Sequence, residues 1–219
     1  MSVKTVQATV NGQTVSLTYN SSTGRYDGTI TAPSKSSYNQ SGHYYGVTIR
    51  ATDDAGNAET ADASHSTLGS SLQLKVREKV APISTITYPT ASALITNNKP
   101  SIVWTITDDD SGVDPSTIGI TIDSGSKITG SSISKTTISG GYRCTYTPGT
   151  ALSDGSHTIT VNASDYDGNA AAQKSVSFKI DTVPPTLSVT SPTDGLVTNQ
   201  ASCTCLLYTS PSPRDGLLS

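Results

Sequence analysis

The side chains best suited to chemistry in this sequence are carboxylates in turns and in one linking segment. Carboxylate oxygens are the ligands that Ca²⁺ prefers, and a protein site usually offers about six to eight oxygens. The candidate calcium ligands are Glu78, Asp108, Asp109, Asp110, Asp165 and Asp167. The alternative interpretation is that Asp, Gly and Asn are here simply turn formers, because the sequence has no dense Asp-x-Asp-x-Asp ligand loop.

Tyrosines beside a polar loop are a second candidate for binding. Tyr38 and Tyr44 flank the loop of residues 32–42, where aromatic side chains could contact a sugar. Tyr45 stands next to them but falls in the inward register of the following strand. We therefore predict Tyr38 and Tyr44 as candidate ligand contacts and Tyr45 as a core residue.

Other chemistry is poorly supported by the residue pattern. His43, His65 and His157 belong to no metal-binding or nucleophile motif, and no phosphate-binding loop is present. His157 begins a strand, so we predict a surface or flanking position for it. These patterns predict no catalytic residue, no enzyme activity and no cofactor beyond a structural calcium ion.

Charge and hydropathy exclude two further classes of partner. The net charge is −3 with no basic run, which argues against nucleic-acid binding. No apolar run approaches the length of a membrane span.

The elements that would position these residues form an internal repeat. Residues 163–169 repeat residues 51–57 at an offset of 112, and the Pro-containing segment at Pro185 repeats that at Pro82 at an offset of 103. A period near 100 residues matches one small β-sandwich. We predict a first unit (1–79), a second unit (80–182) and the start of a third (183–204).

Alternating apolar residues predict strands in both units and show one difference between them. Ile102, Trp104 and Ile106 alternate in the second unit, so Trp104 should be buried in a sandwich core. Residues 6–10 match residues 118–122, so we expect the first unit to start in mid-domain and lack two opening strands. Either an upstream segment supplies those strands or the first unit is a shorter variant.

These motifs carry a resemblance to a known family. The Trp104 strand, the Asp110-Ser111-Gly112-Val113 turn, the Ala-x-Asp-x-x-Gly-Asn strand ending and the Asp181-Thr182-Val183-Pro184-Pro185 segment resemble bacterial Ig-like repeat domains over about residues 1–204. The resemblance implies an all-β fold of tandem immunoglobulin-like β-sandwiches, as in bacterial surface proteins and phage tail proteins. It also implies that the loops of residues 108–110 and 165–167 lie at one end of the second sandwich, with Glu78 nearby.

The cysteines and the last residues need separate interpretation. Cys144 is the only cysteine in a complete repeat and alternates with two tyrosines, so we predict a small buried apolar residue and no disulfide within the sandwich. Residues 205–219, which include Cys205, resemble the translation of a transposase-type sequencing adapter; the alternative is a natural linker rich in Pro and Ser. We leave them out of the fold prediction and expect the natural protein to be longer.

The expected function is that of a non-enzymatic repeat module of a surface-displayed protein, acting as a spacer with weak adhesion to cell-surface carbohydrate or protein. The expected partners within the chain are neighbouring Ig-like domains, with limited packing between them. No signal peptide follows Met1, so we favour a phage virion protein. The alternatives are a bacterial cell-surface adhesin and the non-catalytic stalk of a secreted glycoside hydrolase, so the location is the virion or the cell exterior.

Overall fold

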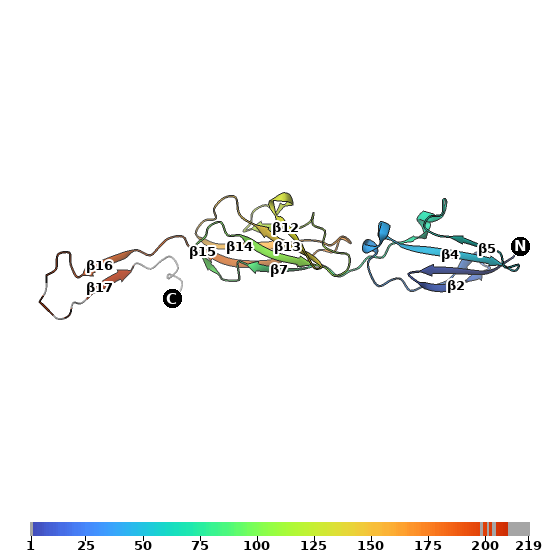
Figure 1. Ribbon diagram of the computed structural model, residues 1–219, viewed down its shortest axis with the longest axis horizontal. Helices are drawn as coiled ribbons and strands as arrows, with labels where there is room; N and C mark the ends of the chain where they lie inside the picture. Colours follow the sequence, from blue (N-terminus) through green and yellow to red (C-terminus); the bar gives the residue numbers. More distant parts are fainter. Residues whose placement is uncertain (1, 198, 201, 203–204, 210–219) are drawn as a thin grey trace.

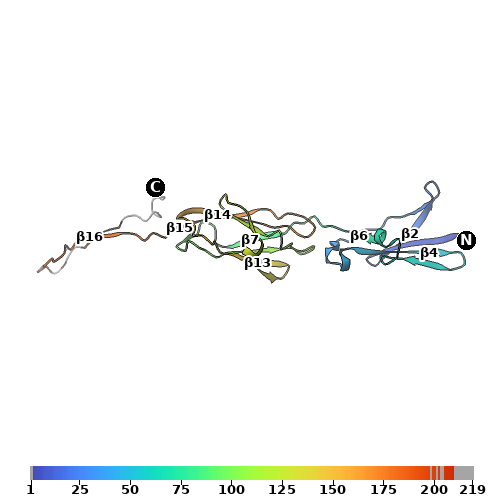
Figure 2. The same cartoon turned by 90° about the horizontal axis from the view of Figure 1, so that it is seen from above.

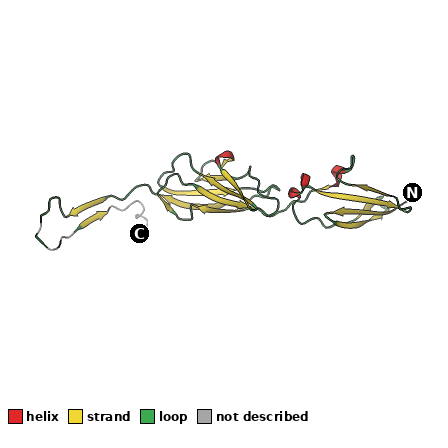
Figure 3. Cartoon of the chain, viewed as in Figure 1, coloured by secondary structure: helices red, strands yellow, loops and turns green. Residues whose placement is uncertain are grey.

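A computed structural model of the chain describes residues 2–197, 199–200, 202 and 205–209. The fold is all-β, with strands joined by loops and a few short 3₁₀ turns (Figure 3). The first unit, the second unit and a short β-ribbon follow one another in an elongated row (Figure 1). The same order is seen after a quarter turn about the long axis (Figure 2).

The first unit is one sheet in the described residues. Its strands run in the order β3-β2-β1-β4-β5, and β6 pairs with the other end of β4. The elements are β1 (Val3–Val10), β2 (Gln13–Asn20), β3 (Arg25–Asp27), η1 (Ser37–Asn39), η2 (Ser41–His43), β4 (Tyr45–Asp53), β5 (Ala58–Ala61), η3 (Gly69–Leu72) and β6 (Gln73–Leu74). The last strand of this unit, β6, is only two residues long.

Strand register gives this sheet one apolar face and one polar face. Ala8 on β1 pairs with Val15 on β2 and Ile49 on β4, whereas the adjacent Thr9 pairs with Thr14 and Thr48. Since successive side chains of a strand point to opposite faces, the apolar residues share one face. The first unit is therefore amphipathic.

The second unit has two sheets. One has the order β11-β10-β14-β15-β8 and the other β12-β13-β9-β7. The elements are β7 (Ile83–Tyr88), β8 (Leu94–Ile95), β9 (Ile102–Thr107), β10 (Gly119–Ile122), β11 (Ile128–Thr129), η4 (Gly130–Ser132), β12 (Ser134–Ile138), β13 (Gly141–Tyr146), β14 (Gly155–Asn162) and β15 (Lys174–Ile180).

The core of the second unit lies between these sheets. Ile102, Trp104 and Ile106 on β9 are completely buried, as are Ile159 and Val161 on β14. The prediction of a buried tryptophan is confirmed. Cys144 is a buried free thiol, and burial raises its pKa to about 11, which confirms its interpretation as a small apolar core residue.

The third part is a two-stranded ribbon of β16 (Leu187–Ser191) and β17 (Leu206–Thr209). Cys205 is an exposed free thiol just before β17. Cys203, Thr204 and residues 210–219 of the predicted adapter tail lie outside the described residues.

Candidate functional site

The site forms where the first unit meets two loops of the second unit. One loop follows β9 and contains Asp108–Gly112, and the other follows β14 and contains Asp165–Asn169. Val113 and Asp165 form an isolated β-bridge, and the Tyr166 amide donates to Gly112 O at 3.1 Å. The two acidic loops thus lie side by side at one end of the second unit.

Backbone amides fix the two buried aspartates of these loops. Asp108 Oδ1 accepts from the amides of Asp110 at 3.0 Å and Gly112 at 2.7 Å. Asp165 Oδ1 accepts from the Asn169 amide, and its Oδ2 accepts from the Asn169 side chain, both at 2.7 Å. Short polar side chains commonly stabilise turns in this way, so the turn-former interpretation describes part of their role.

Glu78 reaches the same place from the segment between the units. Its Oε1 accepts from the Ser111 amide at 2.6 Å. The backbone on either side is also held, because the Glu78 amide donates to Asp167 Oδ2 at 3.0 Å and the Asn169 side chain donates to Glu78 O at 3.2 Å. The linking segment is therefore attached to both acidic loops.

Three of the six predicted calcium ligands converge. Glu78, Asp108 and Asp165 each place one oxygen within 4.8 Å of the other two, and both aspartates are buried. Within the described residues, the one ion pair is between His157 and Asp123, so no lysine or arginine neutralises the three carboxylates. Like charges this close repel, and the repulsion is stronger away from bulk water.

The other three predicted ligands have different positions. Asp167 holds the Glu78 amide, and Asp110 Oδ1 accepts from the Ser36 amide of the first unit at 3.0 Å. Asp109 is exposed. These three carboxylates surround the acidic cluster (Glu78, Asp108 and Asp165) without belonging to it.

Sequence reasoning missed Ser111, which lies beside the acidic cluster. Its hydroxyl is buried and has no hydrogen-bond partner, while its amide donates to Glu78. A buried hydroxyl without a partner is unfavourable. The Asp-Ser-Gly turn was visible in the sequence, but the orphaned hydroxyl depends on the approach of Glu78 from another unit.

Two open grooves flank the cluster, and Asp108 lines both. One, of about 420 Å³, is also lined by Tyr38 and Tyr166. The other, of about 350 Å³, is lined by Glu78 and Lys35 among others. Lys35 is the basic side chain on this groove, although it forms no ion pair in the described structure. Solvent ions therefore have a path to Asp108 and Glu78.

Tyr38, a predicted sugar contact, lies in the contact between the units. Its ring stacks on Tyr166 of the second unit, with centroids 4.1 Å apart and planes 8° apart, and on His43 at 4.2 Å. The neighbouring Asn39 side chain donates to Asp110 O. The expectation of limited packing between units is wrong at this junction, because an aromatic stack and side-chain hydrogen bonds join them. Tyr44 is half-buried just before β4.

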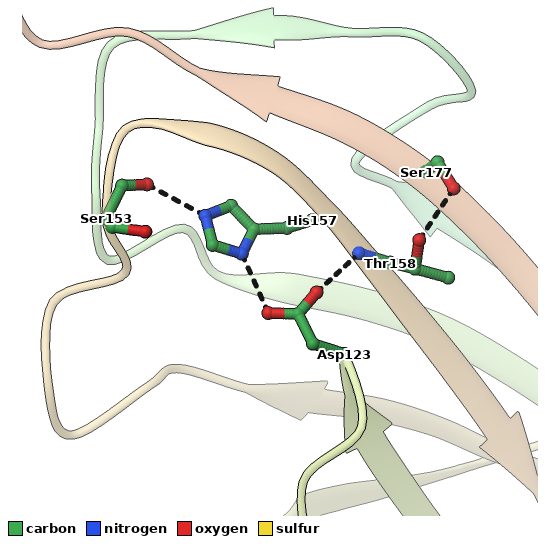
Figure 4. Close-up of polar contacts among 5 residues, drawn as sticks. All are labelled: Asp123, Ser153, His157, Thr158 and Ser177. Atoms are coloured by element: carbon green, nitrogen blue, oxygen red, sulfur yellow. Dashed lines mark hydrogen bonds and ion pairs between the residues drawn. The ribbon is translucent and has the colours of Figure 1, made fainter.

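His157 is buried, so its predicted surface position is wrong. Nδ1 bonds Asp123 Oδ2 at 2.9 Å and Nε2 bonds Ser153 O at 2.8 Å, while Asp123 Oδ1 accepts from the Thr158 amide at 2.8 Å (Figure 4). Both ring nitrogens face acceptors, so the protonated imidazolium satisfies both bonds. Burial lowers the pKa of His157, but the bonds to Ser153 and Asp123 outweigh it and leave that pKa raised. With both nitrogens engaged, the contact joins loops and offers no free base.

Comparison with known families decides what the second unit is. Residues 89–182 match the sequence model of a family described as bacterial Ig-like domain. Residues 89–182 form a bacterial Ig-like domain. The match includes Asp108 and Asp165 but not Glu78, so the acidic cluster joins the Ig-like domain to the segment before it. Bacterial Ig-like domains are generally non-catalytic, often mediate protein interactions and are typically extracellular or surface-associated.

No curated protein matches the chain. Among solved structures, CopC from Methylosinus trichosporium OB3b is 20% identical with a TM-score of 0.32, covering 45% of this chain and 93% of that one. Fibronectin(III)-like modules of Clostridium thermocellum CbhA are 17% identical with a TM-score of 0.34, covering 81% and 78%. A chimeric titin Z1Z2 tandem is 12% identical with a TM-score of 0.25, covering 80% and 82%. Similarity at these levels does not bear on function.

The helices of the described residues are all short 3₁₀ turns. None of them is long and apolar enough to cross a membrane.

Proposed function

We propose that this chain is a non-catalytic spacer of a longer surface-displayed protein, and that Ca²⁺ bound by Glu78, Asp108 and Asp165 fixes the junction between its units. The observation that carries the proposal is that these carboxylates converge from the linking segment and the Ig-like domain with no basic partner among the described residues. A spacer transmits orientation only if its joints are stiff, and this joint concentrates charge that a cation would neutralise.

The residues present fit a hard divalent cation. The acidic cluster offers carboxylate oxygens, and the orphaned Ser111 hydroxyl adds a neutral oxygen nearby. Calcium accepts irregular sets of oxygen ligands and usually completes them with water. When bound, the ion would supply electrostatic attraction between the linking segment and the two loops.

The chain itself pre-arranges most of this geometry. Amides hold Asp108 and Asp165 in their turns, and the Ser111 amide orients Glu78. The stack of Tyr38 on Tyr166 holds the first unit against the same loops. The cost of ordering these groups on metal binding is therefore reduced.

Thermal unfolding of the full chain tests the proposal. Excess calcium should raise the unfolding temperature of the second unit, because a ligand that binds only the folded state stabilises it by about 2.7 kcal/mol at one hundred times its dissociation constant. Glu78→Gln should reduce the shift, and Asp109→Asn is the matched control because Asp109 is exposed outside the cluster. Magnesium serves as the ion control. An unchanged unfolding temperature in excess calcium would disprove the site.

The biological setting of the proposal is a phage virion, most simply a tail protein. The alternatives are a bacterial adhesin and the stalk of a secreted glycoside hydrolase. A long sequencing read across both ends of the gene distinguishes them. Flanking tail or capsid genes support the virion, whereas a signal peptide with an anchor, or a catalytic domain, supports the corresponding alternative.

Weak adhesion to cell-surface carbohydrate is the second part of the proposed function. Tyr44 is its candidate contact, since Tyr38 already stacks between two rings. Binding of labelled protein to bacterial cells or immobilised glycans should fall for Tyr44→Ala and stay unchanged for Tyr19→Ala, an exposed tyrosine elsewhere on the first unit. Equal binding by both variants would remove Tyr44 from the proposal.

A further inference from the structure

The larger of the two grooves beside the acidic cluster has charged side chains of one sign only. Its acidic and aromatic lining residues are Asp108, Asp109, Asp110, Tyr38, Tyr142 and Tyr166. Among the described residues that line it there is no lysine, arginine or histidine. Its volume of about 420 Å³ is within the range of pockets that hold small ligands. A groove lined in this way attracts cations and repels anions.

Asp109 offers the most available charge in this groove. Asp108 and Asp110 each accept a backbone amide through one oxygen, whereas the Asp109 carboxylate has no hydrogen bond or ion pair within the described part of the chain. A Cβ added at Gly140 would lie 3.3 Å from Asp109 Oδ1. The glycine therefore leaves room beside this carboxylate for a group that enters the groove.

The tyrosines supply further acceptors and a flat surface. Tyr166 stacks on Tyr38 with planes 8° apart, yet it is still 38% exposed. Burial, and then the nearby Tyr142 and Tyr38, raise the pKa of Tyr166, so its phenol is neutral. Among the described residues, the tyrosine hydroxyls that form hydrogen bonds are those of Tyr26 and Tyr45. The three hydroxyls of the groove are therefore available to a ligand.

A buried hydroxyl in the wall of the groove also lacks a partner. Ser111 lines the groove and is 1% exposed, and its hydroxyl forms no hydrogen bond with any described residue. Polar atoms left unpaired at this depth are unfavourable and rare in folded proteins. The hydroxyl oxygen can accept from an N–H group, so a hydrogen-bond donor inside the groove would satisfy it.

We propose that this groove binds an arginine side chain presented by a partner protein. A guanidinium group is planar, remains charged at physiological pH and carries its N–H donors in a fixed fork. It can bond the Asp109 carboxylate through two N–H groups and stack on the open part of Tyr166. A lysine ammonium matches the charge but not the flat shape, and a neutral sugar does not match the charge.

A protein is the expected source of this arginine. Bacterial Ig-like domains often mediate protein interactions. Arginine is enriched in protein interfaces and is frequent among the residues that dominate their affinity. The partner should therefore insert an arginine into the groove at the centre of its contact.

The groove and the acidic cluster are separate sites that share Asp108. Glu78 and Asp165 belong to the cluster and do not line the groove, whereas Asp109 lines the groove and lies outside the cluster. The proposal therefore goes beyond the calcium site proposed above. Its test is run in chelator, so that the failure of one proposal leaves the other standing.

An NMR titration of the full chain with a capped Gly-Gly-Arg-Gly-Gly peptide is the test. The amide signals of Gly112, Gly140 and Tyr166 should shift along one saturable curve, with a dissociation constant on the order of 1 mM because few atoms make the contact. The same peptide with citrulline in place of arginine keeps the shape and removes the charge. It should bind about tenfold more weakly, because charge-assisted hydrogen bonds are the stronger ones. Equal shifts with both peptides, or no shift with the arginine peptide, would overturn the proposal.

Asp109→Asn then assigns the binding to the groove. It should raise the dissociation constant of the arginine peptide about threefold, as expected for one solvent-accessible ion pair. Asp54→Asn removes the same charge from an exposed turn of the first unit and should leave the constant unchanged. Equal weakening by both variants would mean attraction to the overall charge, which contradicts a site. If maltotriose shifts the groove amides and the arginine peptide does not, the groove holds sugar and the proposal is wrong.

Discussion

Three carboxylate side chains at the junction combine two opposing effects. Without a cation, Glu78, Asp108 and Asp165 repel one another, while their hydrogen bonds to amides hold the loops in shape. Glu78 and Asp108 each accept these amide bonds through one oxygen, so an amide side chain at either position can keep the accepted bonds and remove one negative charge. Whether a charge-removing substitution raises or lowers the stability of the second unit should therefore depend on calcium.

Asp108→Asn is the sharpest form of this prediction, because both accepted bonds go to Asp108 Oδ1. In chelator, the variant should unfold at a higher temperature than the parent, by about 1 kcal/mol of relieved repulsion. In excess calcium the order should reverse, because the variant has lost a ligand. Differential scanning calorimetry in both buffers measures the two unfolding temperatures and shows whether their order reverses. A variant that is less stable than the parent by the same amount in both buffers would contradict the prediction.

His157 makes the stability of the second unit depend on pH, which its position in the sequence did not suggest. Its pKa is raised above the ordinary 6.5, so its stabilising contribution is complete below that value and is lost as pH rises through the folded-state pKa. Burial raises the pKa of Asp123, but bonds from Thr158 and His157 outweigh it, so that pKa is lowered and its contribution is lost only as pH falls below about 3.8.

The second unit should therefore be more stable at pH 5.5 than at pH 8. Asp123→Asn should flatten this dependence and cost about 1 kcal/mol at pH 5.5, since hydrogen bonds to charged groups are among the stronger ones. Urea unfolding followed by the fluorescence of Trp104, the single tryptophan, provides the readout. A stability that is equal at the two pH values in the parent chain would show that the imidazolium contributes nothing.

Among the elements, β4 and β14 are the same strand in two different environments. Val161→Ala on β14 should cost about 2–3 kcal/mol, because it removes two fully buried methyl groups and leaves a cavity. Val47→Ala on half-buried β4 should cost less than half as much. Urea unfolding followed by Trp104 fluorescence measures the cost of Val161→Ala, and hydrogen exchange of β4 amides measures the cost of Val47→Ala. Equal costs would mean that the face of the first unit is closed in solution.

Strand alternation and turn chemistry predicted most elements because they are local. The alternating Ile102, Trp104 and Ile106 predicted a strand with a buried tryptophan, and they form the buried face of β9. His157 was misplaced because its partner Asp123 lies on another loop, a contact without a local signal. The acidic cluster was predicted in outline from the sandwich topology. Which three carboxylates converge depends on the path of the linking segment.

At the scale of the whole molecule, the junction determines how the chain behaves as a spacer. The stack of Tyr38 on Tyr166 and the bonds of Ser36 and Asn39 to Asp110 join the first unit to the second. The internal repeat could not predict these contacts. In the described residues no further sandwich follows the second unit, so this junction is not itself repeated. They hold the two units together in an elongated rod and so restrain the angle between them (Figure 1).

Tyr38→Ala should loosen this rod without unfolding it. The loss of an aromatic pair costs about 0.5–1.5 kcal/mol at the contact, whereas the core around Trp104 is untouched. Small-angle X-ray scattering should show a broader distribution of interatomic distances for Tyr38→Ala than for the parent, with Tyr19→Ala as the control. Identical scattering from parent and variant would mean that the stack does not restrain the units.

Calcium titration calorimetry on the full chain, stripped with chelator beforehand, tests the central claim most directly. The account predicts a single saturable site that Asp109→Asn leaves unchanged and that Glu78→Gln weakens at least tenfold, about 1.4 kcal/mol. Glu78 is the informative position because it lies outside the Ig-like domain and is brought to the site by the junction alone. No saturable binding, or binding that Glu78→Gln does not change, would contradict the account.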